Sequence, residues 1–239
     1  MAATLGIGLV LGSFNGTLIA YLGIPPIVVT LGTMSIYRGA VFLVSRGAWV
    51  NAQDFGKPYL AFPTARLFGL THIVWISAVI LLIAYVFLNH LNKGRELYAL
   101  GGTPGAARYV GINNTHNLML VYLVTGVVSA LAGYLWVARY AIAYTEIALG
   151  FELQTIAACV IGGVSIAGGK GSITGCLLGS AFLVIVFNAL PVINVSPFWQ
   201  MAISGAVVLA AVILNSRGER ERGKVILEAA RPPQAQVLS

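Results

Sequence analysis

The sequence offers few residue combinations that could carry out covalent chemistry. The segment GGKGS at residues 168–172 resembles a phosphate-binding loop, in which a lysine and backbone N–H groups hold phosphate oxygens. Its spacing departs from GxxxxGK followed by Ser or Thr, because Val164 stands where the first glycine should be and Gly171 follows the lysine. ATP is therefore not expected to bind to this segment.

The titratable side chains also predict no catalytic or metal centre. His72, His90 and His116 lie near the ends of apolar stretches and lack the spacing of metal ligands. No nucleophile is accompanied by a base and an orienting acid that would assemble in one pocket. The chain is therefore predicted not to be an enzyme, and to bind no metal or organic cofactor.

The composition argues against a water-soluble globule. Of the 239 residues, 58% are hydrophobic and 9% are charged, against about 25% charged residues in an average soluble domain. The net charge of +7 does not predict a nucleic-acid partner, since the basic residues lie between apolar stretches and not on a polar domain. Membrane lipid is the expected surrounding.

Stretches without Asp, Glu, Lys or Arg indicate the membrane crossings, because a bilayer core about 30 Å thick needs about 20 apolar residues per helix. Four such stretches cover residues 1–37, 71–92, 117–138 and 171–216, and a shorter apolar run covers residues 153–169. Turn residues divide the first and the last of them into two helices each. Seven helices are therefore predicted, over residues 3–22, 24–43, 72–91, 118–138, 153–167, 172–190 and 198–214.

These helices predict an all-α fold, a polytopic transmembrane helical bundle over residues 1–216 with a cytoplasmic loop at residues 92–117. Residues 217–239 form a basic, disordered cytoplasmic tail in this interpretation. With the C-terminus in the cytoplasm, nine basic residues lie inside and four outside, as the positive-inside rule requires. Arg38 lies within a span, and its side chain is expected to reach the outer interface. The N-terminus would then lie outside without a leader, which predicts further helices before Met1.

Small residues at intervals of four predict close helix contacts. In lipid there is no water to expel, so close approach of two backbones must supply the packing. Two glycine sets would each line one face of a helix: Gly8, Gly12 and Gly16, and Gly171, Gly175 and Gly179. We interpret both sets as structural contacts.

The cytoplasmic loop contains start and stop signals for a helix of about two turns. Thr103 suits an N-cap, Pro104 suits the first helical position, and Gly111 ends the helix. An isolated helix this short is marginal in water, so it needs a surface to pack on. That surface belongs either to the same chain or to another subunit.

Three sequence segments resemble the permeases of bacterial ABC importers for monosaccharides, the group that includes ribose, rhamnose and autoinducer-2 systems. They are FNGTLIAYLGIPPIVVTLGTMSIYRG (residues 14–39), GRELYALGGTPGAARYVGI (residues 94–112) and FELQTIAACVIGGVSIAGGKGSITG (residues 151–175). The resemblance implies a permease of about ten helices, of which seven are present here, so that the chain is truncated at its N-terminus. It also implies a multi-pass location in the bacterial cytoplasmic (inner) membrane.

The same resemblance implies three protein partners. These are a cytoplasmic ATP-binding subunit that holds ATP and Mg²⁺, an extracytoplasmic or periplasmic solute-binding protein, and a second permease copy or paralogue. In the family, the loop that matches residues 94–112 couples the permease to the ATPase. The positions that match the family pattern are Gly101, Gly102, Ala106, Ala107, Arg108 and Gly111, whereas Pro104 and Gly105 depart from it.

A sugar-like solute that crosses a membrane must meet hydroxyls, amides and aromatic rings that replace its water. The candidate pathway residues are Asn15, Thr30, Thr33, Ser35, Tyr37, Glu152, Gln154 and Thr155. The hydroxyls could instead bond to their own helix. Glu152 is equally well explained as an acid at a helix start.

Two other classes of function remain open from the sequence. An ion-coupled carrier or a channel would generally carry ionisable residues within its spans, and the central regions here lack Asp, Glu and Lys. This absence favours an external ATPase as the energy source. The third possibility is a non-functional permease fragment.

Overall fold

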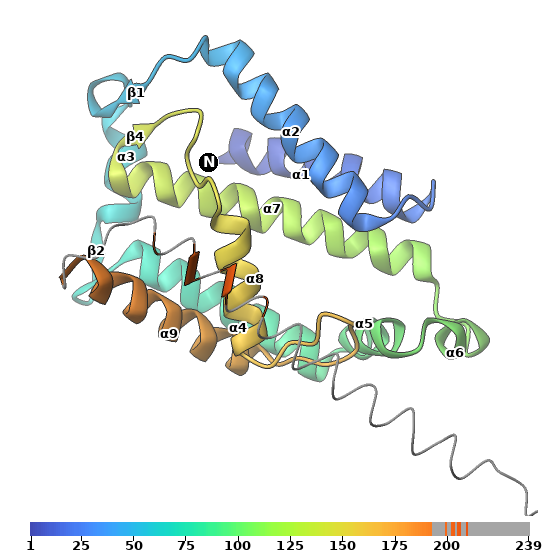
Figure 1. Ribbon diagram of the computed structural model, residues 1–239. Coiled ribbons are helices and arrows are strands. Elements are labelled where there is room, and N and C mark those ends of the chain that lie inside the picture. The colour runs from blue at the N-terminus through green and yellow to red at the C-terminus, as the bar shows by residue number, and fades with distance from the viewer. Residues whose placement is uncertain (193–198, 200–201, 204, 207–208, 210–239) are drawn as a thin grey trace, which may run out of the picture. The chain divides into compact units, whose positions relative to one another are not determined.

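The computed structural model describes residues 1–192 together with residues 199, 202, 203, 205, 206 and 209. The chain divides into two compact units, Met1–Leu149 and Gly150–Ser239, and each is described by itself. Helices dominate, and the strands in the described part are only two residues long (Figure 1). The predicted all-α class is confirmed.

Four helices of the first unit are long and apolar enough to cross a membrane: α1 (Ala2–Ala20), α2 (Pro26–Ser45), α4 (His72–His90) and α7 (Asn114–Tyr140). They contain 19, 20, 19 and 27 residues. At 1.5 Å per residue these lengths are about 28 to 40 Å, against a hydrocarbon core of about 30 Å. The helices predicted at residues 3–22, 24–43, 72–91 and 118–138 are confirmed.

The first glycine set packs α1 against α7. Gly8, Gly12 and Gly16 are buried. A Cβ atom at Gly12 would lie 2.6 Å from the carbonyl oxygen of Tyr122, and one at Gly16 would lie 2.7 Å from the sulfur of Met119. Rising residue numbers on α1 therefore face falling numbers on α7, so the two helices run antiparallel. The structural interpretation of this glycine set is confirmed.

A short folded connection joins α2 to α4. It contains β1 (Val50–Asn51), the 3₁₀ helix η1 (Ala52–Asp54), α3 (Lys57–Thr64), β2 (Arg66–Leu67) and β3 (Leu70–Thr71). β1 pairs antiparallel with β4 (Ile142–Ala143), which follows α7. α3 is joined to α7 by the hydroxyl of Tyr134, which donates to the carbonyl oxygen of Tyr59 at 3.3 Å. These contacts tie the chain that leaves α2 to the chain that leaves α7.

The segment between α4 and α7 consists of two helices, α5 (Asn92–Gly102) and α6 (Pro104–Tyr109). The sequence predicted only the second. α6 ends as predicted: Gly111 has φ +83°, and its N–H donates to the carbonyl oxygen of Arg108 at 3.0 Å. The N–H of Ile112 donates to the carbonyl oxygen of Ala107 at 3.1 Å, which completes a Schellman motif. Thr103 takes the N-cap position, but its side chain makes no capping hydrogen bond.

The second unit contains α8 (Phe151–Ile161) and α9 (Ile173–Val192). The helix predicted over residues 153–167 ends six residues early, at Ile161. The glycines beyond it account for the difference, because Gly163 has φ +84° and Gly168 has φ +94°, a conformation that ends a right-handed helix. With 11 residues, α8 is about 17 Å long and does not cross a bilayer by itself.

The second glycine set serves the packing of α8 against α9 only in part. A Cβ atom at Gly179 would lie 2.8 Å from the backbone nitrogen of Gly162, and Gly175 also faces Gly162. Gly171 lies before the start of α9, where a Cβ atom would lie 3.1 Å from the side chain of Val164. The predicted stripe is therefore two residues long on the helix.

Two predictions fall on parts of the chain that the structure does not describe. The tail at residues 217–239 lies wholly outside the described residues, and so does most of the helix predicted over residues 198–214.

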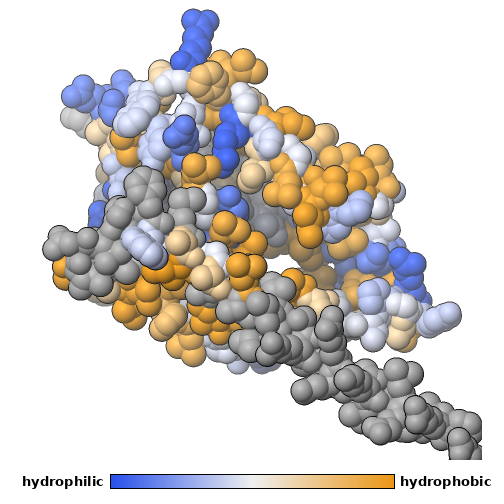
Figure 2. Space-filling model, in the orientation of Figure 1, coloured by the Kyte–Doolittle hydropathy of each residue, from blue (hydrophilic) through white to orange (hydrophobic). Residues whose placement is uncertain are grey.

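Large apolar side chains are exposed along the membrane-length helices. They include Ile27, Leu31 and Leu43 on α2, with exposed fractions of 72%, 55% and 78%, and no residue of α4 is buried. Figure 2 shows apolar residues gathered over α2, whereas polar residues gather at the end of the unit formed by α5 and α6. In water such a surface would be unfavourable, but in a bilayer it faces lipid.

Candidate functional site

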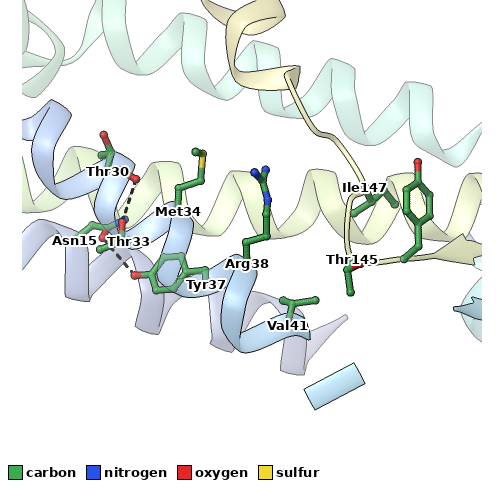
Figure 3. Close-up of a pocket in the computed structure, with 10 residues that line it drawn as sticks. Asn15, Thr30, Thr33, Met34, Tyr37, Arg38, Val41, Thr145 and Ile147 are labelled. Carbon is green, nitrogen blue, oxygen red and sulfur yellow. Dashed lines mark hydrogen bonds between the residues drawn. The ribbon is translucent and has the colours of Figure 1, made fainter. Parts of the chain in front are cut away.

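The first unit contains a pocket of about 370 Å³, open to the surface, between α1, α2 and the chain that follows β4 (Figure 3), and we call it the cavity. It falls within the range of about 300 to 1,000 Å³ that is typical of small-molecule sites. Its lining residues are Asn15, Thr30, Thr33, Met34, Tyr37, Arg38, Val41, Tyr144, Thr145 and Ile147.

Helix α2 supplies most of the lining because of its periodicity. Its six lining residues follow one another at intervals of three, one, three, one and three, which places them on one face of an α-helix. Thr30 and Thr33 lie at one end of this face, and Val41 lies at the other (Figure 3). α1 adds Asn15.

The β1–β4 pair positions the third wall. Ala143 pairs with Val50, and the next residue, Tyr144, enters the lining. The ring of Tyr144 stacks on that of Trp49, with centroids 5.3 Å apart. The chain after α7 is therefore held over the cavity by both backbone and ring contacts.

Hydrogen bonds within the unit occupy the hydroxyl donors of α2. Thr30 donates to the carbonyl oxygen of Pro26 at 2.9 Å, and Thr33 donates to that of Thr30 at 3.3 Å. The hydroxyl of Tyr37 lies 3.3 Å from the side-chain oxygen of Asn15 and 3.4 Å from the carbonyl oxygen of Leu11, so its proton serves one of these acceptors. The expected alternative for both threonines, a bond to their own helix, is therefore confirmed.

Arg38 is the charged member of the cavity lining. Its side chain extends from α2 on the same side as that of Met34 (Figure 3). Among the residues that the structure describes, no acidic group forms an ion pair with it. The structure places this arginine in the cavity lining, and the expected reach of its side chain to the outer membrane interface stays a prediction.

The α5–α6 segment, residues 92–109, exposes apolar side chains at its end. Tyr109 is 95% exposed, and Val110, which follows it, is 80% exposed. Ala107 is buried within the unit. The six positions expected from the family pattern are thus divided. Ala107 is buried and Gly101 is half-buried, whereas the other four are exposed: Gly102, Ala106, Arg108 and Gly111.

One polar contact ties this segment to α7. The side-chain amide of Asn117 donates to a carboxylate oxygen of Glu96 on α5 at 3.0 Å, and Lys93 forms an ion pair with the same oxygen at 2.8 Å. These two partners, Lys93 first, lower the pKa of Glu96 below its usual value. Glu96 is therefore ionised at neutral pH.

Four of the eight candidate pathway residues meet at one place, whereas Ser35 on α2 and the three candidates on α8 are not part of the lining. Asn15, Thr30, Thr33 and Tyr37 all line the cavity. Glu152 and Gln154 lie in the first turns of α8, in the second unit. Glu152 is exposed and occupies the first turn of its helix, as its alternative explanation requires. A solute-binding role for any of these residues stays a prediction.

Several residues of the site escaped the sequence analysis. Tyr144 and Thr145 reach the cavity only because β4 pairs with a strand more than ninety positions earlier in the chain. Tyr109 carried no signal, since a single aromatic residue in a polar loop is unremarkable until its exposure is known. The helical spacing from Thr30 to Arg38 could have indicated that the arginine shares a face with the hydroxyl residues.

Comparison with known proteins places the chain in a family. The family model for the permease component of the branched-chain amino acid transport system matches residues 1–212. The chain belongs to this permease family. No solved structure matches it.

Individual permeases of known transport systems are similar in sequence to this chain over most of its length. The autoinducer 2 import system permease protein of Salmonella paratyphi B is 34% identical over 215 residues, which is 90% of this chain and 62% of that protein. The ribose import permease protein of Escherichia coli K12 is 36% identical over 223 residues, 91% of this chain and 68% of that protein. The chain thus spans about three fifths of the length of the autoinducer 2 permeases that it matches.

Proposed function

We propose that the chain is a translocation subunit of an ATP-binding-cassette importer, and that it forms part of the pathway for a small sugar-like solute. The observation that carries the proposal is a cavity of about 370 Å³, lined by hydroxyl, amide and phenol groups and set between two membrane-length helices. Apolar membrane packing alone does not require such a lining. Membership of the permease family and the similarity to autoinducer 2 and ribose permeases support it.

The hydrogen-bond inventory of the cavity favours a solute rich in oxygen acceptors. The hydroxyl protons of Thr30, Thr33 and Tyr37 are already used within the unit. The guanidinium of Arg38 and the side-chain amide nitrogen of Asn15 have no partner among the described residues and can each donate. A solute with several hydroxyl or ring oxygens would accept hydrogen bonds from these two groups. The oxygens of the threonine hydroxyls would in turn accept hydrogen bonds from the hydroxyls of the solute.

The α5–α6 segment is proposed as the docking site of a cytoplasmic ATP-binding subunit. Tyr109 and Val110 lie outside the membrane-length helices, yet expose large apolar side chains. Aromatic residues in such positions are frequent anchors of protein interfaces. In this proposal ATP and Mg²⁺ are bound by the partner, and this chain is not itself an enzyme.

The proposal includes an orientation and further partners. The chain lies in the bacterial cytoplasmic membrane with its C-terminus and the α5–α6 segment in the cytoplasm, where Lys93, Arg95 and Arg108 obey the positive-inside rule. The solute then arrives from an extracytoplasmic solute-binding protein at the opposite side. A second permease copy or paralogue would complete the pathway.

Uptake into right-side-out membrane vesicles tests the function. The vesicles hold the chain and its ATP-binding subunit, are loaded with ATP, and are offered the solute-binding protein with a panel of labelled pentoses and hexoses. Accumulation of at least one sugar is expected with active ATPase and not with an ATPase unable to hydrolyse ATP. Accumulation that persists without the ATPase and follows a proton or sodium gradient would instead establish a secondary carrier, and no accumulation of any sugar would contradict the proposed solute class.

A further inference from the structure

The contact between Glu96 and Asn117 joins two helices that are not adjacent in the sequence, α5 and α7. α5 carries the carboxylate and α7 the amide, 21 positions apart. Asn117 is 1% exposed, and it is one of the two largest fully buried side chains in the described part of the chain. The Glu96 side chain is 25% exposed, so this polar contact is half-buried, at the point where the α5–α6 segment meets the first turn of α7.

The two polar partners of Glu96 differ in what they contribute. Lys93 lies on the same helix, three positions away, with a side chain that is 47% exposed. An exposed pair of this kind contributes little to stability, because water screens the charges. The bond from the buried amide of Asn117 is charge-assisted and less accessible to water, and it links α5 directly to α7.

Stability alone is a poor explanation for the asparagine. Its amide nitrogen is satisfied by Glu96, but its side-chain oxygen is buried without a hydrogen-bond partner. An unsatisfied buried acceptor costs free energy, and an apolar residue of similar size would avoid that cost. A leucine, however, could not donate a hydrogen bond to the carboxylate of Glu96.

Rigid packing continues from this contact toward the cavity. α7 begins three residues before Asn117 and runs antiparallel to α1, with Gly12 and Gly16 close against Tyr122 and Met119. A glycine interface of this kind leaves little space for the helices to slide independently. α1 in turn carries Asn15 to the cavity, where it contacts Tyr37 of α2.

We propose that Glu96 and Asn117 are positioning residues that transmit displacement of the α5–α6 segment to α7, and through α1 to the cavity wall. The inference rests on the proposed function, in which an ATP-binding subunit moves α6. Neither residue contacts solute or nucleotide in this scheme. Their contact converts movement of a short cytoplasmic helix into movement of a membrane-length helix.

Hydrogen exchange of the chain in nanodiscs tests the contact without any partner. The variants are Glu96→Ala and Asn117→Leu, with Arg95→Ala as the matched control, because Arg95 is an exposed neighbour whose guanidinium bonds to Asn92 of its own helix. Amides of residues 103–112 are expected to exchange about tenfold faster in the first two variants, the size expected for the loss of one hydrogen bond to a charged group. Equal exchange in Glu96→Ala and Arg95→Ala would overturn the proposal, even if Asn117→Leu fails to fold.

The ratio of uptake to ATP hydrolysis tests the transmission itself. In the complete importer, Glu96→Ala is expected to lower sugar taken up per ATP hydrolysed by about tenfold while ATPase binding is retained, and Glu96→Gln, which keeps an acceptor for Asn117, should restore most of it. A merely structural role would lower the amount of complex and leave this ratio unchanged, and that result would refute transmission. If the wild-type chain binds no ATPase, the proposed function fails together with transmission, whereas an intact complex with an unchanged ratio refutes transmission alone.

Discussion

The phenol of Tyr37 on α2 and the side-chain amide of Asn15 on α1 meet at 3.3 Å in the wall of the cavity. The two residues lie 22 positions apart, and the same hydroxyl also lies 3.4 Å from the carbonyl oxygen of Leu11 on α1. Separation of α1 and α2 at this level would have to lengthen both of these contacts. Substitution of Tyr37 is therefore a direct test of how α1 and α2 are held at the cavity.

Replacement of Tyr37 by Phe should weaken the connection without changing the apolar packing of the ring. The loss of one hydrogen bond is expected to cost about 0.5 to 1.5 kcal/mol of unfolding free energy. Thermal unfolding in detergent would measure the cost, with Tyr21→Phe as the control because Tyr21 is 68% exposed. Equal unfolding temperatures of the two variants would show that the bond contributes nothing.

Replacement of Arg38 by Gln should weaken solute recognition. The side chain keeps an amide donor but loses the charge and the fork geometry that suit paired oxygen atoms. We expect the half-saturating solute concentration for uptake to rise about tenfold or more, as for the loss of a hydrogen bond to a charged group. Arg66→Gln serves as the control, since Arg66 lies in β2, is exposed and is absent from the cavity lining. Similar saturation curves for both variants would contradict a solute-binding role of Arg38 and favour the interfacial role expected from the sequence.

A methyl group at Gly12 should disrupt the contact between α1 and α7. Its Cβ would lie 2.6 Å from the carbonyl oxygen of Tyr122, a backbone atom that cannot move aside without shifting α7. Gly12→Ala is therefore expected to destabilise the unit by about 1 to 3 kcal/mol. Gly6→Ala is the matched control on the same helix, because nothing lies within 4 Å of a Cβ there. Stability would be compared by thermal unfolding, and equal values for both alanine variants would contradict the antiparallel glycine interface.

Replacement of Tyr109 by Ala should reduce binding of the ATP-binding subunit without affecting the fold. The side chain is 95% exposed, so its removal leaves no cavity inside the chain. If it anchors the interface, the dissociation constant should rise about 30-fold, which corresponds to about 2 kcal/mol. Phe68→Ala is the control, because Phe68 is 89% exposed but lies in the connection between α2 and α4. Should Phe68→Ala weaken binding and Tyr109→Ala not, the orientation in the membrane would have to be reversed.

Acidification should release the contact between α5 and α7. Lys93 and then Asn117 lower the pKa of Glu96 in the folded protein, so the stabilisation by this carboxylate is present above the unfolded pKa and is lost as the pH falls through the folded pKa. No change is expected between pH 7 and about pH 5.5, and loss should begin below the value of an ordinary glutamate, about 4.3. The ¹³C shift of the Glu96 carboxyl group, assigned with Glu96→Gln, would report this titration. A midpoint above that ordinary value would contradict the contact.

The sequence by itself determined the class of fold and the family. Long stretches without charge have no stable alternative to membrane helices, because each unpaired backbone group is costly in lipid. For this reason the predicted helices at residues 3–22 and 72–91 agree closely with α1 and α4. The end of α6 could also be predicted from the sequence, since only a glycine adopts the φ of +83° found at Gly111 without strain.

Only the tertiary structure decided which residues form the site. Tyr144 reaches the cavity through the β1–β4 pair, and Glu96 meets Asn117 because α5 packs against α7, contacts that no local pattern contains. Exposure separated Tyr109 from Ala107 although they are two residues apart on the same short helix. Local sequence sets the periodicity of one helix, whereas a binding surface depends on which faces of several helices meet, and this is a property of the packed chain.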